Sequence, residues 1–407
     1  MGNALISRRG GGYATVKFEN YGEPTFSRGL ATDFDDEISS IGATTVGNYA
    51  LFGGGYVGTG SRLSTVYAYN SNLTRSKITS LSVARSGAGA TTVGNYALFA
   101  GGYAGGTTPQ TSTADTYTSG LVKGTATSLS VARYGLAATT IGNYALFGGG
   151  YNGSSYSPTV DAYNSSLTRS TPTALSVARR GLAATTVGNY ALFGGGYDGS
   201  SYSSKVDAYN SSLTRSTPTA LSVARDDLSA TTAGSYALFG GGEASSFSST
   251  VDAYNSSLTR STPTALSDAK QYLAATTVRD YALFGGGRLY SSSSGTSYSA
   301  VVDAYNSNLI RSKLTDLSYG RDALSATTIG DYALFGGGAT PTISDSDESR
   351  VDYYKIAFPN ITLNVYKGSK YKFQNMSSET TVTSNMEIIS IPTPATGYIK
   401  FKNATIS

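Results

Sequence analysis

One four-residue phrase, Tyr-Ala-Leu-Phe, occurs seven times along the chain, each time followed within one residue by consecutive glycines. The steps between neighbouring copies are 47, 48, 46, 46, 45 and 51 residues. Helical hairpin arrays have units of about 33 or 34 residues, whereas a four-stranded propeller blade takes about 40–50. The period therefore predicts an all-β fold, a seven-bladed β-propeller. The copies begin at Tyr49, Tyr96, Tyr144, Tyr190, Tyr236, Tyr281 and Tyr332.

The composition agrees with short strands and tight turns. The 407 residues include 49 glycines and 32 tyrosines, and only 14% are charged. Histidine and cysteine are absent, which removes disulfides, thiol chemistry and the commonest general bases. A net charge of +4 does not indicate nucleic acid, and no long apolar run indicates a membrane span or a signal peptide. We therefore expect neither nucleic acid nor a membrane span.

The fourth unit shows the strand pattern most clearly. Strands one to four are predicted over 181–187, 190–193, 205–210 and 213–221, with a Gly-Asn hairpin turn between the first two. Pro218 cannot donate to a ladder, so strand four is expected at the outer edge of the blade. Strand one then lies innermost, where its small Ala-Ala-Thr-Thr run suits a crowded axis. We expect the Leu and Phe of each repeated phrase to form the core between blades.

Three features together resemble kelch repeats over residues 24–357: the glycine run after a short apolar strand, Val-Asp-Ala-Tyr in strand three, and Leu-Ser-Val-Ala-Arg before the next unit. The near-identical copies are similar to kelch-like proteins of bacteria and bacteriophages. Some kelch propellers are copper oxidases, but their site uses His and a Cys-linked Tyr, which this chain lacks. The tryptophan usual in strand four is also absent. Leucines are expected to fill its space: Leu73, Leu167, Leu213, Leu258 and Leu309.

The seventh unit has strands one to three but no Leu-Thr-Arg strand after them. Residues 26–45 match residues 167–186 without a gap, so the missing pattern occurs at the N-terminus. Because a propeller avoids free sheet edges by closing, residues 24–34 are predicted to be strand four of the seventh blade.

Two pieces flank the propeller of residues 24–357. Residues 1–23 are predicted to be an N-terminal arm, and residues 358–407 a β-rich C-terminal appendage with strand-like alternation. The appendage is either a docking or oligomerisation element or a β-flap packed on the propeller.

The loops divide between two faces because successive strands run in opposite directions. The 1–2 and 3–4 turns barely vary between copies, whereas the 2–3 and 4–1 loops diverge. Tyr, Ser, Gly and Asn in such loops are typical of adaptable recognition surfaces, although drift on an unused surface would also give divergence. Recognition is the favoured interpretation. The predicted ligand-binding residues are Tyr56, Tyr103, Tyr134, Tyr151, Arg180, Tyr197, Asp226, Asp227, Glu243, Gln271, Tyr272, Arg288, Tyr290 and Asp322.

Three charged positions recur in nearly every unit, and recurrence favours a structural role over a ring of cations facing an acidic ligand. Oppositely charged residues on paired strands stabilise a hairpin. The position before strand one holds Arg85, Arg133, Arg179, Arg225, Lys270 and Arg321. Strand three holds Asp115, Asp161, Asp207, Asp252, Asp303 and Asp352. Strand four holds Arg28, Arg75, Lys123, Arg169, Arg215, Arg260 and Arg311.

One acidic group breaks the repeat, and both of its segments are expected on the same face at the seventh blade. Its carboxylates either bind Ca²⁺, which takes oxygen ligands, or form a solvated patch. No other cofactor is expected. The residues are Asp35, Asp36, Glu37, Asp345, Asp347 and Glu348.

These observations favour a non-enzymatic binding protein. The expected setting is a phage virion or tail, assembled in the host cytoplasm, where the variable loops recognise a host-surface glycan or protein. The arm or the appendage would then contact other virion or tail proteins. One alternative is a cytoplasmic kelch adaptor for a single protein partner, and another is a glycan hydrolase with paired carboxylates at the blade-seven rim.

Overall fold

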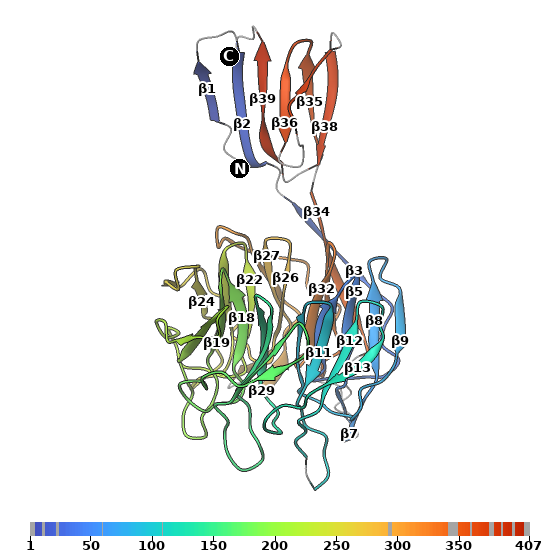
Figure 1. Ribbon diagram of the computed structural model, residues 1–407, viewed down its shortest axis with the longest axis vertical. Helices are drawn as coiled ribbons and strands as arrows, with labels where there is room; N and C mark the ends of the chain where they lie inside the picture. Colours follow the sequence, from blue (N-terminus) through green and yellow to red (C-terminus); the bar gives the residue numbers. More distant parts are fainter. Residues whose placement is uncertain are drawn as a thin grey trace. The chain divides into compact units, whose positions relative to one another are not determined.

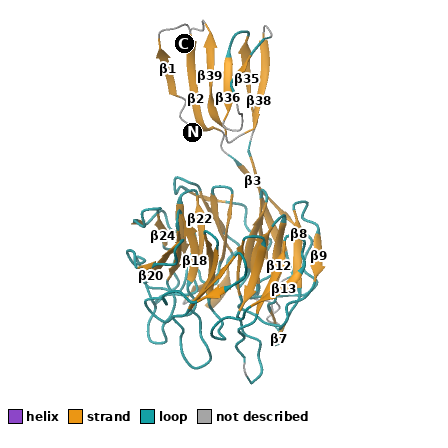
Figure 2. Cartoon of the chain, in the orientation of Figure 1, coloured by secondary structure: helices purple, strands orange, loops and turns teal. Residues whose placement is uncertain are grey.

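The computed structural model describes residues 5–9, 13–21, 24–58, 60–107, 109–291, 295–340, 349–358, 360–373, 378–383, 386–392 and 395–402. Every regular element in this part of the chain is a β-strand (Figure 2). Nothing in it is a helix of the length and apolar character that a membrane crossing needs. The chain forms two compact units, residues 28–355 and residues 1–27 with 356–407.

The larger unit is a seven-bladed β-propeller, as predicted, and each blade is a four-stranded antiparallel sheet (Figure 1). Blade 1 consists of β4 (Gly42–Val46), β5 (Tyr49–Gly53), β8 (Val66–Asn70) and β9 (Arg75–Ile78). Blade 2 consists of β10 (Gly89–Val93), β11 (Tyr96–Ala100), β12 (Ala114–Thr118) and β13 (Lys123–Ala126). Blade 3 consists of β14 (Ala137–Ile141), β15 (Tyr144–Gly148), β16 (Val160–Asn164) and β17 (Arg169–Ser170). Blade 4 consists of β18 (Ala183–Val187), β19 (Tyr190–Gly194), β20 (Val206–Asn210) and β21 (Arg215–Ser216).

The remaining blades repeat this order. Blade 5 consists of β22 (Ser229–Ala233), β23 (Tyr236–Gly240), β24 (Val251–Tyr254) and β25 (Arg260–Ser261). Blade 6 consists of β26 (Ala274–Val278), β27 (Tyr281–Gly285), β30 (Val302–Tyr305) and β31 (Arg311–Lys313). Blade 7 consists of β32 (Ser325–Ile329), β33 (Tyr332–Gly336), β34 (Val351–Ala357) and β3 (Thr25–Leu30). Two loops carry short ribbons, β6 (Tyr56–Val57) with β7 (Ser61–Arg62) and β28 (Arg288–Ser291) with β29 (Gly295–Tyr298).

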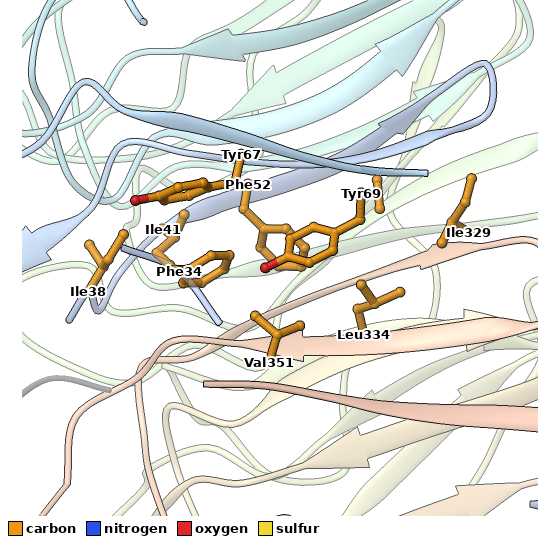
Figure 3. Packing of buried hydrophobic residues seen from close by; sticks show 10 residues of the cluster. Phe34, Ile38, Ile41, Phe52, Tyr67, Tyr69, Ile329, Leu334 and Val351 are labelled. Carbon is orange, nitrogen blue, oxygen red and sulfur yellow. The ribbon is translucent and has the colours of Figure 1, made fainter. Parts of the chain in front are cut away.

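The outermost place of β3 in blade 7 confirms the predicted closure. The Arg28 Nε donates to the Asp352 carboxylate at 3.0 Å, and the Ala31 N–H donates to the Val351 carbonyl at 2.9 Å. Phe34, just after β3, packs into the cluster between blades 7 and 1 (Figure 3). Its ring stacks on Tyr67 of blade 1 at 4.9 Å between centroids. A segment from the start of the chain therefore joins the last blade to the first.

The second strand of each blade carries the core, because neighbouring blades cover both of its faces. In β19 every residue after Tyr190 is buried, whereas β18 alternates between buried and half-buried. Leu146 of blade 3 and Phe193 of blade 4 lie in one cluster, which confirms the predicted inter-blade core. The glycine at the end of strand two permits this contact, since a Cβ on Gly148 would lie 2.8 Å from the Phe193 ring.

The predicted extent of strand four is wrong. In blade 4 that strand is only Arg215–Ser216, so Pro218 follows it and does not lie in it. The Asn210 side chain accepts hydrogen bonds from the N–H groups of Ser212 and Thr214, and this tight turn holds Leu213 at a φ of 60°. Leu213 packs against the inter-blade core from the turn, not from a strand. The corresponding turn leucines have the same conformation: Leu73, Leu167, Leu258 and Leu309.

The innermost strands are joined by a ring of threonine hydroxyls that the sequence analysis did not predict. Strand one of each blade carries two consecutive threonines. At every blade interface, the hydroxyl of the first threonine in one blade lies within hydrogen-bond distance of the hydroxyl of the second threonine in the next blade. The hydroxyl of that second threonine also donates to a backbone carbonyl of the preceding blade. The Oγ1–Oγ1 pairs are Thr44–Thr92 (3.0 Å), Thr91–Thr140 (2.8 Å), Thr139–Thr186 (3.0 Å), Thr185–Thr232 (3.1 Å), Thr231–Thr277 (2.7 Å), Thr276–Thr328 (2.8 Å) and Thr327–Thr45 (2.9 Å).

The recurring charges are structural, and the interpretation as a ligand-facing cation ring is wrong. Arg133 has no exposed surface, pairs with Asp161 of the same blade at 2.8 Å, and donates to the carbonyls of Phe147 and Gly149 at the end of strand two. Arg169 of strand four approaches the other carboxylate oxygen at 3.2 Å. The other cations at the Arg133 position are equally buried: Arg85, Arg179, Arg225, Lys270 and Arg321.

The smaller unit combines both ends of the chain. Its five-stranded sheet has the order β1 (Leu5–Arg9), β2 (Tyr13–Tyr21), β39 (Ala395–Lys402), β36 (Lys370–Phe373) and β37 (Thr380–Thr381). β35 (Asn360–Tyr366) pairs with β38 (Met386–Pro392). The N-terminal arm and the C-terminal appendage, treated as separate pieces in the sequence analysis, thus share one sheet through β2 and β39.

Candidate functional site

The 2–3 and 4–1 loops form one surface of the propeller, which we call the loop face. The ribbon strands β7 and β29 mark it at the lower side of the propeller in Figure 1. In each blade a 4–1 residue forms a backbone bridge with the first residue of the 2–3 loop: Ser39–Tyr56, Ser86–Tyr103, Tyr134–Tyr151, Arg180–Tyr197, Asp226–Glu243, Gln271–Arg288 and Asp322–Ala339. Eleven of the fourteen predicted residues are members of these bridges, so the structure places them on one circle.

The next residue in each 4–1 loop has a positive φ between 49° and 65°. These residues bond to one another from blade to blade. The Asp227 N–H donates to Gly181 O at 2.8 Å, and the Tyr272 N–H donates to Asp227 O at 3.1 Å. Asp227 and Tyr272, two further predicted residues, are therefore held by a run of six backbone hydrogen bonds that links these positions from blade to blade. The seven positions are Ser40, Gly87, Gly135, Gly181, Asp227, Tyr272 and Ala323.

Six half-buried tyrosines form a continuous run of ring contacts across blades 2, 3 and 4, which we call the tyrosine track. Successive centroids are 5.3, 5.9, 5.1, 5.9 and 5.7 Å apart. Their order is Tyr103, Tyr134, Tyr151, Tyr156, Tyr197 and Tyr202. The sequence analysis missed Tyr156 and Tyr202, although each follows a predicted loop tyrosine by five residues, a spacing that offered a usable signal.

Arg62 connects blade 1 to this track. Its guanidinium carbon lies 5.2 Å from the Tyr56 ring centroid and 4.6 Å from that of Tyr103, within the range of cation–π attraction. Arg62 was also missed, because nothing in the repeat pattern distinguishes β7 from other loop segments. The tyrosine track and Tyr56 thus form a connected series around about half of the loop face.

At its other end the track meets three carboxylates. The Tyr202 hydroxyl donates to Glu243 at 3.2 Å. Burial and the neighbouring charges of Asp227 and Glu243 raise the pKa of Asp226 to about 7. Burial likewise raises the pKa of Asp227 to about 6, against the lowering effect of a hydrogen bond from Tyr272. Asp226 and Asp227 therefore change protonation near neutral pH.

A hollow of about 490 Å³ lies on the loop face where blades 6, 7 and 1 meet. Four predicted residues line it, namely Tyr56, Tyr272, Arg288 and Asp322. The Arg288 Nε donates to the Asp322 carboxylate at 2.6 Å, and the Arg288 guanidinium lies 5.1 Å from the Tyr272 ring centroid. Tyr298 of β29, which the sequence analysis missed, also lines the hollow.

The other predicted residues lie outside this hollow. Tyr290 is 66% exposed and its ring is 6.2 Å from Phe247 of the neighbouring blade. The tyrosine track runs over blades 2 to 4, on the part of the circle that the hollow does not reach. The predicted set therefore comprises a hollow, a track and an acidic group on one face.

The acidic group proposed for calcium has other partners where the structure describes it. Asp35 forms an ion pair with Arg75, and Asp36 accepts a hydrogen bond from the Tyr67 hydroxyl at 3.0 Å. Asp345, Asp347 and Glu348 lie outside the described residues. Within the described part of the chain, no three acidic side chains are grouped so that they would hold a metal ion.

No protein-family model matches the sequence, and no curated protein matches it. Among solved structures 518 chains match. One of them, the structure of YjhT, has a TM-score of 0.53 and 11% sequence identity, and the match covers 81% of this chain and 99% of that one. At this identity the likeness shows the fold alone, a β-propeller.

Proposed function

We propose that this chain is a non-enzymatic binding protein whose loop face recognises a host-surface glycan or protein, as part of a phage particle. The observation that carries the proposal is the tyrosine track, which lies on the face where the copies of the repeat differ most. Tyrosine offers a rigid apolar ring and a polar hydroxyl, which suits recognition surfaces.

The two faces of the propeller differ in chemistry. The 1–2 turns keep a Gly-Asn pair in most blades, and residues such as Asn143 and Asn189 are exposed there. On the loop face, by contrast, one and the same 4–1 loop position holds Tyr134, Arg180 and Asp226 in three successive blades. Variation among large aromatic and charged side chains on one face supports selection for a ligand.

The absence of histidine and cysteine from the sequence supports binding without catalysis. The proposed phage setting rests on the near-identical repeats rich in Ser, Thr, Tyr, Gly and Asn. Mass spectrometry of purified phage particles tests that setting separately from the binding activity, because the particles should contain this chain.

The test of binding uses the full chain on an array of host-surface glycans and on intact host cells. The double variant Tyr134→Ser/Tyr197→Ser should weaken binding about tenfold or more, since buried aromatic anchors dominate interface energy. Asn143→Ser/Asn189→Ser changes the same two blades on the opposite face and should leave binding unchanged.

Three results would oppose the proposal. Equal binding by the two double variants would remove the loop face as the recognition surface. Absence of binding to glycans and to host cells would remove the function itself. Release of reducing sugar from a bound glycan would show that the protein is a hydrolase.

A further inference from the structure

We propose that the hollow between blades 6, 7 and 1 binds one uncharged sugar residue, with Asp322 and Arg288 recognising two adjacent hydroxyl groups of its ring. This inference rests on the proposed function and assigns a ligand class to one part of the loop face. The site is independent of the tyrosine track, which lies on other blades.

The strongest observation concerns Asp322. Its side chain has no exposed surface, and its Oδ2 accepts the hydrogen bond from Arg288 Nε at 2.6 Å. Its Oδ1 is buried and has no hydrogen-bond partner among the described residues. A buried carboxylate oxygen without a donor is costly, and Asp322 lines the hollow. A ligand hydroxyl would satisfy Oδ1 once the carboxylate turns towards the hollow, and we include this small rotation in the proposal.

Arg288 supplies the complementary donor. The guanidinium has five N–H groups, and the bond to Asp322 uses the one at Nε. Its side chain is 36% exposed, so its terminal nitrogens can donate to a ligand oxygen. One acceptor next to one donor matches a pair of neighbouring hydroxyls, of which the first donates and the second accepts.

The walls of the hollow favour a sugar ring over other polar ligands. Tyr56 and Tyr272 line it beside Tyr298, and aromatic surface packs well against the C–H face of a pyranose. The charges of Arg288 and Asp322 neutralise each other, so neither a carboxylate nor an ammonium group finds a net opposite charge there. The volume of about 490 Å³ is sufficient for one hexose and part of a second.

The experiment titrates the full chain with methyl glucopyranoside, methyl galactopyranoside, methyl mannopyranoside and their disaccharides, observed by saturation-transfer NMR. We expect saturable binding of at least one of them, at about millimolar affinity for a single residue. Asp322→Asn should weaken this binding about tenfold or more, because the amide places a donor where the ligand needs an acceptor. Methylation of the two adjacent hydroxyls should have a similar effect.

A matched control exists on the opposite face. Arg279 and Asp331 also form an Arg–Asp pair between blades 6 and 7, at 2.5 Å, but lie in the 1–2 turns. Asp331→Asn should leave sugar binding unchanged. If Asp322→Asn lowers the melting temperature strongly, Tyr56→Leu tests the same hollow and should also weaken binding.

Unchanged affinity in both hollow variants would overturn the inference, and so would saturable binding of charged sugars or of peptides alone. If host-cell binding is lost in Tyr134→Ser/Tyr197→Ser but no uncharged sugar binds the hollow, the sugar site is wrong and the proposed function stands. If neither host cells nor any glycan is bound, both fail.

Discussion

The hydroxyl oxygens of Thr45 and Thr327 lie 2.9 Å apart, although 282 residues separate them in the sequence. Thr45 also donates to the Thr328 carbonyl at 2.9 Å. These bonds join β4 of blade 1 to β32 of blade 7, and the same pairing occurs at the six other blade interfaces, for example between Thr139 and Thr186. The propeller is thus closed at its axis by the same kind of threonine hydrogen bonds that join all the other neighbouring blades. It is also closed at its outer edge by β3.

Replacing Thr45 with valine keeps the shape of the side chain but removes its hydroxyl. The Thr327 hydroxyl and the Thr328 carbonyl then lose a partner, so the free energy of unfolding should fall by about 1–3 kcal/mol. Thr45→Ser retains the hydroxyl and should cost less. Denaturant unfolding measures both, and a loss confined to Thr45→Ser would show that the methyl group, not the bond, is what matters.

Each buried Arg–Asp pair should depend on both partners. Arg133→Ala leaves the Asp161 carboxylate buried beside only the partly exposed Arg169, and should destabilise the protein by about 3–5 kcal/mol. The exposed pair supplies the control, since Arg279→Ala should cost no more than about 1 kcal/mol.

Blade 1 already replaces this pair with uncharged residues, Ile38 at the arginine position and Tyr67 at the aspartate position, both buried. The double variant Arg133→Ile/Asp161→Tyr should therefore lose less stability than the sum of its two single variants. A double-mutant cycle measures the difference, and strict additivity would contradict a direct interaction between the two positions.

Stability should depend on the protonation of Asp226. Its pKa is raised to about 7 in the folded protein, from an ordinary value near 4, so the neutral carboxyl stabilises the fold at low pH. That contribution is fully present below about pH 4 and is lost as the pH rises towards 7. Asp226→Asn mimics the neutral form and should be more stable than the parent at pH 8 by about 1–3 kcal/mol, with little difference at pH 4. Melting curves at the two pH values test this, and a constant difference would contradict it.

Gly148 should not tolerate a side chain. A Cβ there would lie 2.8 Å from the Phe193 ring of the next blade, so Gly148→Ala should destabilise by about 1–3 kcal/mol. Phe193→Leu replaces the ring with a smaller aliphatic side chain, and we expect the combination of the two changes to cost less than the sum of their separate costs. The melting temperatures of Gly148→Ala, Phe193→Leu and the double variant test this expectation.

The architecture was predictable because it repeats. The alternation of side chains along a strand and the spacing of 45–51 residues between copies can both be read from the sequence alone. Each of the seven copies shows the same pattern. The closure by residues 24–34 followed from the same logic, since the missing pattern could be found elsewhere in the chain. The structural role of the buried cations, such as Arg133, was also favoured by their recurrence.

Details that depend on turn geometry were less accessible. The short strand four and the left-handed Leu213 arise from hydrogen bonds to the Asn210 side chain, which a strand pattern does not reveal. The partners of Asp35 and Asp36 were missed for another reason. Arg75 and Tyr67 are close to them only because β3 leads directly into blade 1.

By itself the sequence determined the number of blades, the order of their strands and the face on which the copies differ, because each depends on periodicity along the chain. Only the tertiary structure decided which of the differing residues meet. Tyr56 and Asp322 line one hollow because the ring brings the first blade beside the last, and the run from Tyr103 to Tyr202 exists because neighbouring blades place their loops within ring-contact distance. Closure of the ring converts separation along the sequence into proximity, and no local pattern carries that information.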